Sequence, residues 1–174
     1  MNTQHKEKGF TIIEVVLVLA IAGLIFLMVF IALPALQRSQ RDTARKNDVS
    51  RAITALNSYQ SNNKGALPVL TPTNTYGTQN ADGVATPAAS LLARYLKAGG
   101  DDFADPSGKP YTFVTSPTTL PTTSDARTDT QTVVRIFVSA GSTCNGESLT
   151  TGQGNRKVAF RLVLEGGGVL CQSN

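Results

Sequence analysis

The first third of the chain has the hydrophobic pattern of one long helix with two different halves. Every residue from 15 to 33 is apolar or glycine. As a helix, such a run spans about 30 Å of hydrocarbon. Beyond Pro34, apolar residues recur at three-and-four spacing and form a single stripe. The stripe consists of Val49, Ala52, Ile53, Leu56 and Tyr59, and the opposite face carries Arg45, Asp48, Arg51 and Asn57.

These two patterns predict one helix over residues 10–62, apolar all round in its first half and amphipathic in its second. Pro34 is expected to kink the helix without ending it, because the periodicity resumes beyond the proline. The sequence "SNNKGALP" (61–68) is typical of a helix end, with Gly65 as the cap and a proline just beyond it.

A strand-rich domain is predicted after the long helix. Turn formers predict loops at 70–85 and 115–131, and a short helix is expected at 87–100. Alternating apolar residues and turn signals predict strands at 111–114, 132–139, 157–164 and 169–171. Because these strands follow one another closely, we expect an antiparallel sheet packed against the helix stripe. The fold class is therefore α+β.

Positive charge is concentrated around the apolar run. The net charge is +4, yet the chain after Arg51 carries nine basic and eight acidic residues. The excess lies in Lys6 and Lys8 before the run and in Arg38, Arg41, Arg45, Lys46 and Arg51 after it. This arrangement favours contact with lipid head groups or with acidic groups of a partner. DNA binding by the second cluster remains an alternative, since phosphate contact requires only clustered Lys and Arg.

Few residues are candidates for other chemistry. Cys144 and Cys171 are the only cysteines, and an even count behind an apolar segment favours a disulfide in an oxidising compartment over two free thiols. Asp101, Asp102 and Asp105 are a weak Ca²⁺ candidate because they lack a full ligand set, so turn formation is the preferred interpretation. The single histidine is His5, and no serine lies in a nucleophile motif. We therefore expect no enzymatic activity and no cofactor.

Glu14 is the unusual residue of the apolar half. A carboxylate in the first turn of a helix is favoured by the helix dipole. Deep in lipid, however, an unpaired acid costs about 2.5–3.5 kcal/mol, so a partner is expected. Cleavage between Gly9 and Phe10 would create a charged amine one turn from Glu14. In a stack of identical helices, the amine of a neighbouring copy would then meet Glu14 at only one axial stagger.

The stretch "KGFTIIEVVLVLAIAG" resembles the class III signal of type IV pilins and pseudopilins, on Gly9, Phe10, Thr11 and Glu14. This resemblance implies that a prepilin peptidase cuts after Gly9 and methylates Phe10, and that Glu14 sets the register between subunits. Pro34 is similar to the helix-breaking proline of the family. "DPSGKPY" (105–111) resembles a motif of major pseudopilins and of some Gram-positive-type pilins. The Cys144–Cys171 pair resembles the bridge that closes the C-terminal loop of many pilins.

The resemblance implies four regions: a cleaved leader (1–9), a transmembrane and filament-core helix (10–36), the amphipathic half of the same helix (37–63) and a globular pilin domain (64–174). The precursor would be a single-pass protein of the cytoplasmic membrane and the mature subunit part of an extracellular homopolymer. Its partners would be the prepilin peptidase, an assembly ATPase and a platform membrane protein. The fibre would serve adhesion, twitching motility or DNA uptake. A pseudopilin of a type II secretion system is the alternative within the family, and a membrane-tethered domain that never polymerises is the alternative outside it.

Charge counting opposes this topology. Five basic residues follow the apolar run and two precede it, which by the positive-inside rule places the large domain in the cytoplasm. The cysteine pair and the class III signal point outward, and we give them precedence. The basic cluster is then expected to be buried among filament neighbours or to rest on outer head groups.

Overall fold

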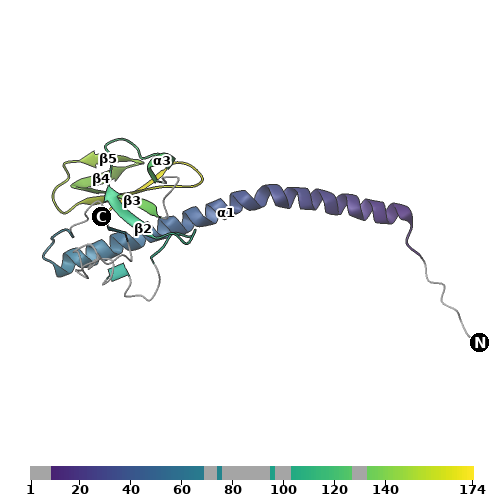
Figure 1. The fold of residues 1–174 in the computed structure, drawn as a ribbon, viewed down its shortest axis with the longest axis horizontal. Helices are drawn as coiled ribbons and strands as arrows, with labels where there is room; N and C mark the ends of the chain where they lie inside the picture. Colours follow the sequence, from purple (N-terminus) through teal and green to yellow (C-terminus); the bar gives the residue numbers. More distant parts are fainter. Residues whose placement is uncertain (1–8, 69–73, 76–94, 97–102, 127–132) are drawn as a thin grey trace, which may run out of the picture. The chain divides into compact units, whose positions relative to one another are not determined.

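The computed structural model describes residues 9–68, 74–75, 95–96, 103–126 and 133–174. Its elements, in chain order, are α1 (Ile12–Asn62), β1 (Asn74–Thr75), β2 (Tyr111–Thr115), α3 (Thr123–Ala126), β3 (Val134–Ala140), β4 (Ser142–Asn145), β5 (Ser148–Thr151), β6 (Val158–Val163) and β7 (Val169–Ser173) (Figure 1). The chain divides into two compact units, Met1–Arg38 and Ser39–Asn174. The second half of α1 thus belongs to the same unit as the strands.

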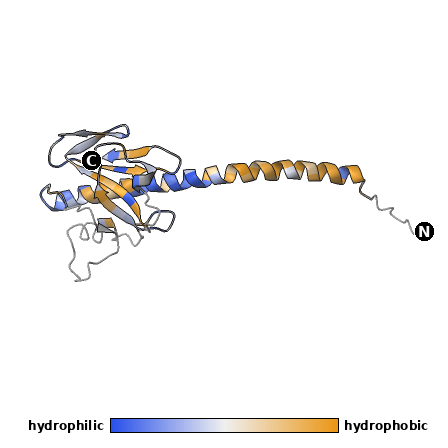
Figure 2. Ribbon diagram, turned by 45° about the horizontal axis from the view of Figure 1, so that its top comes forward, coloured by the Kyte–Doolittle hydropathy of each residue, from blue (hydrophilic) through white to orange (hydrophobic). Residues whose placement is uncertain are grey.

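The prediction of one long helix is confirmed. α1 runs from Ile12 to Asn62 with Pro34 inside it, and its colouring changes from apolar to polar along its length (Figure 2). The helix ends where expected: Lys64 and Gly65 have φ of 54° and 81°, and the Gly65 N–H donates to the Gln60 carbonyl over 2.7 Å. Such left-handed residues terminate a helix by turning the chain back onto its last carbonyls.

A five-stranded sheet with the order β1-β2-β3-β6-β7 forms the centre of the second unit, and β4 and β5 form a separate hairpin. The α+β class is confirmed, but the sheet is mixed, because β2 and β3 are parallel while the other neighbouring pairs are antiparallel. The sequence prediction of a wholly antiparallel sheet is wrong at this pair. The connection 116–133 is long enough for the crossover that parallel strands require.

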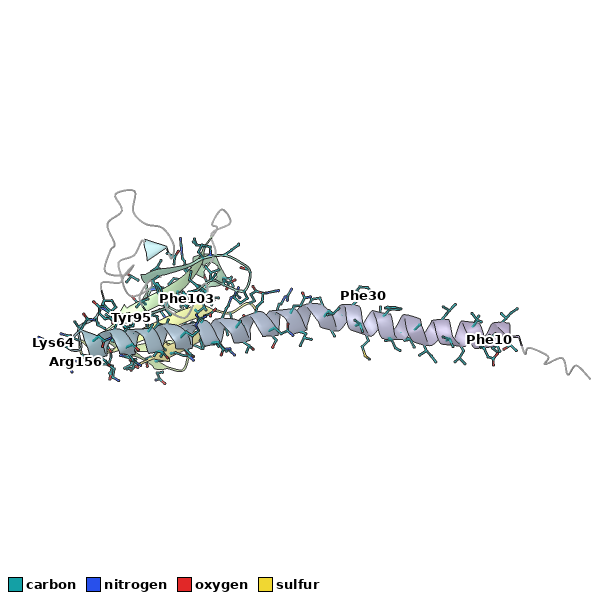
Figure 3. All side chains as sticks on the ribbon, turned by 90° about the horizontal axis from the view of Figure 1, so that it is seen from below. Phe10, Phe30, Lys64, Tyr95, Phe103 and Arg156 are labelled. Atoms are coloured by element: carbon teal, nitrogen blue, oxygen red, sulfur yellow. A yellow bond between two sulfur atoms is a disulfide. The ribbon has the colours of Figure 1, made fainter. Side chains whose placement is uncertain are left out.

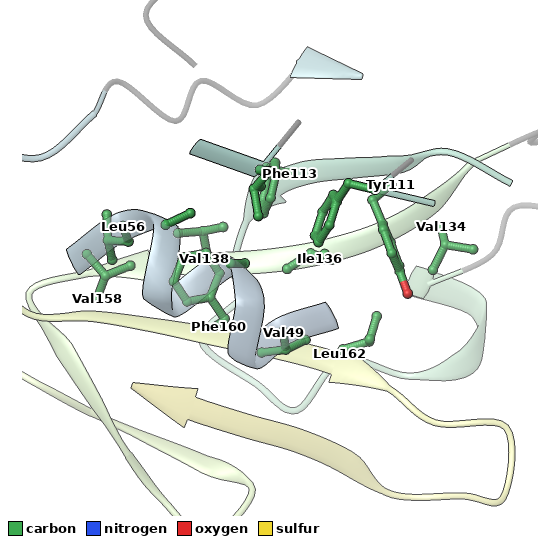
Figure 4. Close-up of a cluster of buried hydrophobic side chains, with 14 residues drawn as sticks. Val49, Leu56, Tyr111, Phe113, Val134, Ile136, Val138, Val158, Phe160 and Leu162 are labelled. Atoms are coloured by element: carbon green, nitrogen blue, oxygen red, sulfur yellow. The ribbon is translucent and has the colours of Figure 1, made fainter. Parts of the chain in front are cut away.

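The core lies between one face of the sheet and the second half of α1 (Figure 4). On the helix, Val49, Ala52 and Leu56 of the predicted stripe are buried, and Ile53 and Tyr59 pack against them half-buried. Period-two residues of the strands face this stripe: Tyr111 and Phe113 from β2, Val134, Ile136 and Val138 from β3, and Val158, Phe160 and Leu162 from β6. The predicted stripe is therefore confirmed as domain core.

The four predicted strands are present within a few residues of the expected bounds, and four further elements were missed. β4 and β5 were not predicted, and β1 and α3 fall in segments expected to be loops. The helix expected at 87–100 lies outside the described residues except for Tyr95 and Leu96. Leu96 is buried, and Tyr95 contacts Tyr59 edge-on with ring centroids 6.0 Å apart.

The sheet face away from the helix also holds a buried charge. Arg161 of β6 is 1% exposed. Its guanidinium donates to the Ser116 hydroxyl, at 2.9 Å from Nε, and to the carbonyls of Pro117 and Thr119. Burial lowers the pKa of Arg161. The residue thus fastens the segment after β2 over this face of the sheet.

Candidate functional site

The bond between Gly9 and Phe10 lies in exposed, non-helical chain before α1. Both residues are exposed, and the Phe10 side chain is 89% exposed (Figure 3). A Cβ added at Gly9 would meet no described atom within 4 Å, and Gly9 does not have a left-handed φ. The described part of the chain therefore does not itself require glycine here.

Thr11 and Glu14 cap the beginning of α1. The Thr11 N–H and hydroxyl both donate to Glu14 Oε2 over 2.8 Å, and the Glu14 N–H lies 3.4 Å from the Thr11 hydroxyl oxygen. This reciprocal arrangement is a capping box, which satisfies N–H groups that have no partner within the helix. In the single chain, the Glu14 carboxylate thus already has donors. The T-x-x-E spacing carries this signal in the sequence, and our sequence analysis missed it.

The first half of α1 presents large apolar side chains on all sides. They include Ile13, Leu17, Ile21, Phe26 and Phe30, each at least half exposed, and Figure 3 shows Phe30 on this helix and Phe10 next to its beginning. By length and composition α1 could cross a membrane, and none of its most apolar stretch is buried within the chain. Such a surface requires lipid or other apolar helices around it. Pro34 lies inside this helix, and the kink expected there stays a prediction.

On the N-terminal side of Val49, the buried side of α1 carries charged residues in place of apolar ones. Asp42, Arg45 and Asp48 are buried on the same side of α1 as Val49. The prediction that Arg45 and Asp48 lie on a solvent-facing side is therefore wrong. Helical spacing alone places Arg45 on this side, four residues before Val49. The sequence could not show its main partners, because they come from distant segments.

Arg45 and Asp105 form the centre of this ion cluster. Arg45 Nε donates to Asp105 Oδ1 over 2.5 Å and Nη2 to Oδ2 over 3.0 Å, and the residues are 1% and 2% exposed. The Ser107 N–H and hydroxyl add donors to Asp105 Oδ2. Burial raises the pKa of Asp105, but the hydrogen bonds from Arg45 and Ser107 outweigh it, so its pKa lies below the ordinary range. Burial likewise acts to lower the pKa of Arg45, and its bonds to Asp105 and Glu165 raise it instead.

The turn between β6 and β7 is attached to the same side of the helix. Glu165 accepts from Arg41 Nη2 over 2.7 Å and from Arg45 Nη2 over 2.8 Å. The turn also donates to the helix: Asp42 accepts hydrogen bonds from the N–H groups of Glu165 and Gly166 over 2.8 and 2.7 Å. A Cβ at Gly166 would lie 3.0 Å from Asp42 Oδ2, so glycine makes room for this contact. Burial opposes ionisation of Glu165, but both arginines lower its pKa from 4.5 to about 2.

Asp48 and Tyr111 extend the cluster into the apolar core. The Tyr111 hydroxyl donates to Asp48 Oδ2 over 2.9 Å, and Arg51 lies 3.4 Å from Asp48 Oδ1. Burial raises the pKa of Asp48 despite these two donors. Burial, followed by the charges of Asp48 and Asp105, also raises the pKa of Tyr111. Tyr111 is therefore a neutral donor to a buried carboxylate.

The ion cluster changes the interpretation of the basic residues that follow the apolar run. Arg45 is buried in its own domain, so the expectation that it meets filament neighbours or lipid head groups is wrong for this residue. Arg41 and Arg51 are also paired with acids of their own chain, whereas Arg38 and Lys46 are exposed. A DNA-binding surface on this cluster thus loses three of its five cations to internal pairs.

The other predicted sites differ in how far the structure describes them. Cys144 of β4 and Cys171 of β7 are joined by a disulfide, with Cα atoms 5.7 Å apart. Asp105 of the Ca²⁺ candidate is engaged with Arg45, which leaves its carboxylate little capacity for a cation. Asp101 and Asp102 lie outside the described residues, and no group of acidic, histidine or cysteine side chains suited to a metal occurs among the residues that are described.

Comparison with known protein families identifies the N-terminal segment. Residues 4–30 match the model described as the prokaryotic N-terminal methylation motif. The chain therefore carries the class III prepilin signal of type IV pilins and pseudopilins. No match was found among curated proteins or among solved structures. The exposed Gly9–Phe10 bond, the capped helix start and the apolar half of α1 all lie within or next to the matched residues.

Proposed function

We propose that this chain is a type IV pilin-like structural subunit that polymerises into an extracellular filament. The observation that carries the proposal is the methylation motif at residues 4–30, which leads directly into a helix whose apolar side chains are exposed. Outside lipid, side chains of this size need other apolar helices around them. A bundle of identical helices offers that environment, so the subunit would leave the membrane by entering the filament core.

In this proposal the precursor is inserted by its apolar helix, and a prepilin peptidase removes residues 1–9 and methylates Phe10. Residues 10–36 form the membrane span and later the filament core, 37–63 the amphipathic half of the helix, and 64–174 the globular domain. An assembly ATPase and a platform membrane protein would drive polymerisation. The disulfide between Cys144 and Cys171 supports an oxidising compartment for the domain.

Glu14 would have two alternative sets of partners. In the single chain it accepts from Thr11. In the filament it would meet the charged amine of a neighbour's Phe10, which exists only after cleavage. The bonds from Thr11 are already charge-assisted by the carboxylate. The neighbour's amine would add an opposite charge, whose attraction to Glu14 strengthens as both groups leave water, so the second arrangement would be favoured in the filament core. Glu14 would thereby set the axial register between subunits.

The task of the filament is a finer question. Surface adhesion, twitching motility and DNA uptake are the candidate uses of a pilus, and a pseudopilus of a type II secretion system is the second candidate function. The 105–111 segment, which resembles a pseudopilin motif, favours the second. Its Asp105 and Tyr111 serve the ion cluster of the domain, so both fibres could use it. The disulfide at the C-terminal strand favours a surface pilus.

Substitution of Glu14 tests the proposal in cells. We expect Glu14→Ala to insert into the membrane normally but to yield no sheared filaments. Glu14→Gln keeps an acceptor for Thr11 and removes only the charge, so it should cap the helix and still fail to assemble. Filaments of Glu14→Ala at the wild-type amount would overturn the role of Glu14 in assembly, and a wild type that yields no filaments would support a tethered domain that never polymerises. Normal filaments of Glu14→Gln would overturn the pairing with a neighbour's amine.

A further inference from the structure

β7 is an edge strand without its own protection against pairing with another chain. It lies at one end of the sheet order, with β6 on one side only. Its sequence, Val-Leu-Cys-Gln-Ser, contains neither a charged residue nor proline. These are the residues by which edge strands usually prevent the addition of a further strand. Protection of β7 must therefore come from outside the strand.

The register with β6 shows which backbone groups of β7 face outward. The Leu164 N–H donates to the Gly168 carbonyl, and the Asn174 N–H donates to the Val158 carbonyl. Both bonds fit the antiparallel register of β6 and β7, so the even-numbered positions of β7 form the backbone hydrogen bonds with β6. In an antiparallel ladder the intervening residues direct their N–H and C=O groups to the other side. These outward residues are Val169, Cys171 and Ser173.

The β4–β5 hairpin contacts these same three residues. Glu147, in its turn, accepts the outward N–H of Val169 at Oε1 over 3.1 Å. Cys171 is bonded to Cys144 of β4. The Ser173 hydroxyl accepts the Cys144 N–H over 3.4 Å. The hairpin thus binds one outward N–H of β7, that of Val169, and is attached to the strand through the side chains of Cys171 and Ser173. β4 and β7 belong to different sheets and form no backbone ladder with each other.

Gly168 makes the contact at Val169 possible. It has a φ of +82°, and a Cβ added there would lie 2.7 Å from Glu147 Oε1. The absence of a side chain allows the carboxylate to reach the beginning of the strand. Glycine at position 168 therefore leaves room for the Glu147 carboxylate, and the positions of Cys144 and Cys171 allow the disulfide.

We propose that the β4–β5 hairpin covers the outer edge of β7, and that this edge, when uncovered, pairs with β7 of a second copy of this chain. An uncharged edge strand is self-complementary in antiparallel orientation, so two copies can pair about a twofold axis. The disulfide and the Glu147 bond keep the hairpin in place and prevent this pairing. By covering this edge, the hairpin would prevent pairing of β7 strands from two copies, which would compete with ordered assembly.

The test uses the full chain in detergent and compares the wild type with the Cys144→Ser/Cys171→Ser double variant. At low protein concentration, we expect the outward amide of Val169 to exchange about fivefold faster in the variant, as for the loss of one net hydrogen bond. At high concentration the outward amides of Val169, Cys171 (serine in the variant) and Ser173 should become protected while sedimentation reports a larger species. Glu147→Ala, which removes the acceptor of the Val169 N–H and keeps the disulfide, should speed exchange at Val169 without association.

A third substitution separates β7 pairing from general aggregation. Ser173→Pro removes one outward N–H and no bond to β6, so adding it to the double variant should restore the wild-type size. Leu120→Ser removes an apolar side chain that is 45% exposed elsewhere on the domain, and it should have no such effect. Association that persists with Ser173→Pro, or that is reduced equally by Leu120→Ser, would overturn the proposal. So would unchanged exchange of the Val169 amide in a double variant with native circular dichroism.

Discussion

Arg45 lies in the middle of the charged section of α1, but its strongest partners, Asp105 and Glu165, come 60 and 120 residues later in the chain. A count of charges in the sequence includes only the five basic residues of this section, Arg45 among them, and their two nearby acids. The folded domain pairs three of those cations internally, so the basic flank of the apolar run is far less charged than the sequence alone indicates. The positive-inside rule counts Lys and Arg irrespective of nearby acids, so the conflict with it remains.

Asp105→Asn tests the weight of the buried pair. The substitution leaves the Arg45 cation in a buried position with only Asp42 and Glu165 near it. Removing one partner of a buried ion pair costs about 3–5 kcal/mol, and we expect the lower end because those two acids remain. Chemical denaturation of the full chain in detergent measures the free energy of unfolding. Lys46→Gln, at an exposed neighbouring position, is the control and should change it by less than about 0.5 kcal/mol.

The lowered pKa values of Asp105 and Glu165 predict acid sensitivity of the domain. A carboxyl whose pKa is lower in the folded state contributes stability above its ordinary pKa and loses it as the pH falls through the folded value. For Glu165 this interval runs from 4.5 down to about 2. Asp48, whose pKa is raised, acts in the opposite sense and favours the folded state when protonated.

We therefore expect the free energy of unfolding to fall as the pH is lowered through this interval. In Glu165→Gln the decrease should be shallower, because the variant has no carboxyl to protonate at that position. Equal slopes in the two proteins would show that the pairs with Arg41 and Arg45 do not contribute to stability.

At the scale of elements, the sequence predicts best where one residue period is sustained. Three-and-four spacing located the stripe from Val49 to Tyr59, and period-two spacing located β6 through Val158, Phe160 and Leu162. β4 and β5 were missed because residues such as Ser142, Thr143 and Ser148 show no apolar alternation, and the hairpin is held instead by a disulfide and side chains. The parallel pairing of β2 and β3 was missed because a long connection allows either orientation.

Leu56→Ala tests the packing of α1 on the sheet. Leu56 is fully buried among residues of the helix and the strands. Truncation of a buried leucine costs about 2–5 kcal/mol, and thermal or chemical unfolding should show this loss. Asn57→Ala, one position along on the exposed face, is the matched control and should be nearly neutral. Equal effects of the two substitutions would contradict the assigned face of the helix.

At the scale of the whole molecule, two units have separate tasks. Residues up to Arg38 carry the methylation motif and the exposed apolar helix, and residues from Ser39 carry the sheet, the ion cluster and the disulfide. The methylation motif and the helix of the first unit could be predicted, because both lie in one continuous segment of the sequence. The sites of the second unit could not, because they join residues that only the fold brings together.

The central claim is that this chain is processed at Gly9 and exported as a filament subunit. The most direct test is the mass and N-terminal sequence of the protein sheared from the surface of cells that produce it. We predict a chain that begins at N-methylated Phe10 and contains the Cys144–Cys171 disulfide. A sheared or membrane-bound protein that still begins at Met1, with both cysteines as free thiols, would contradict the account.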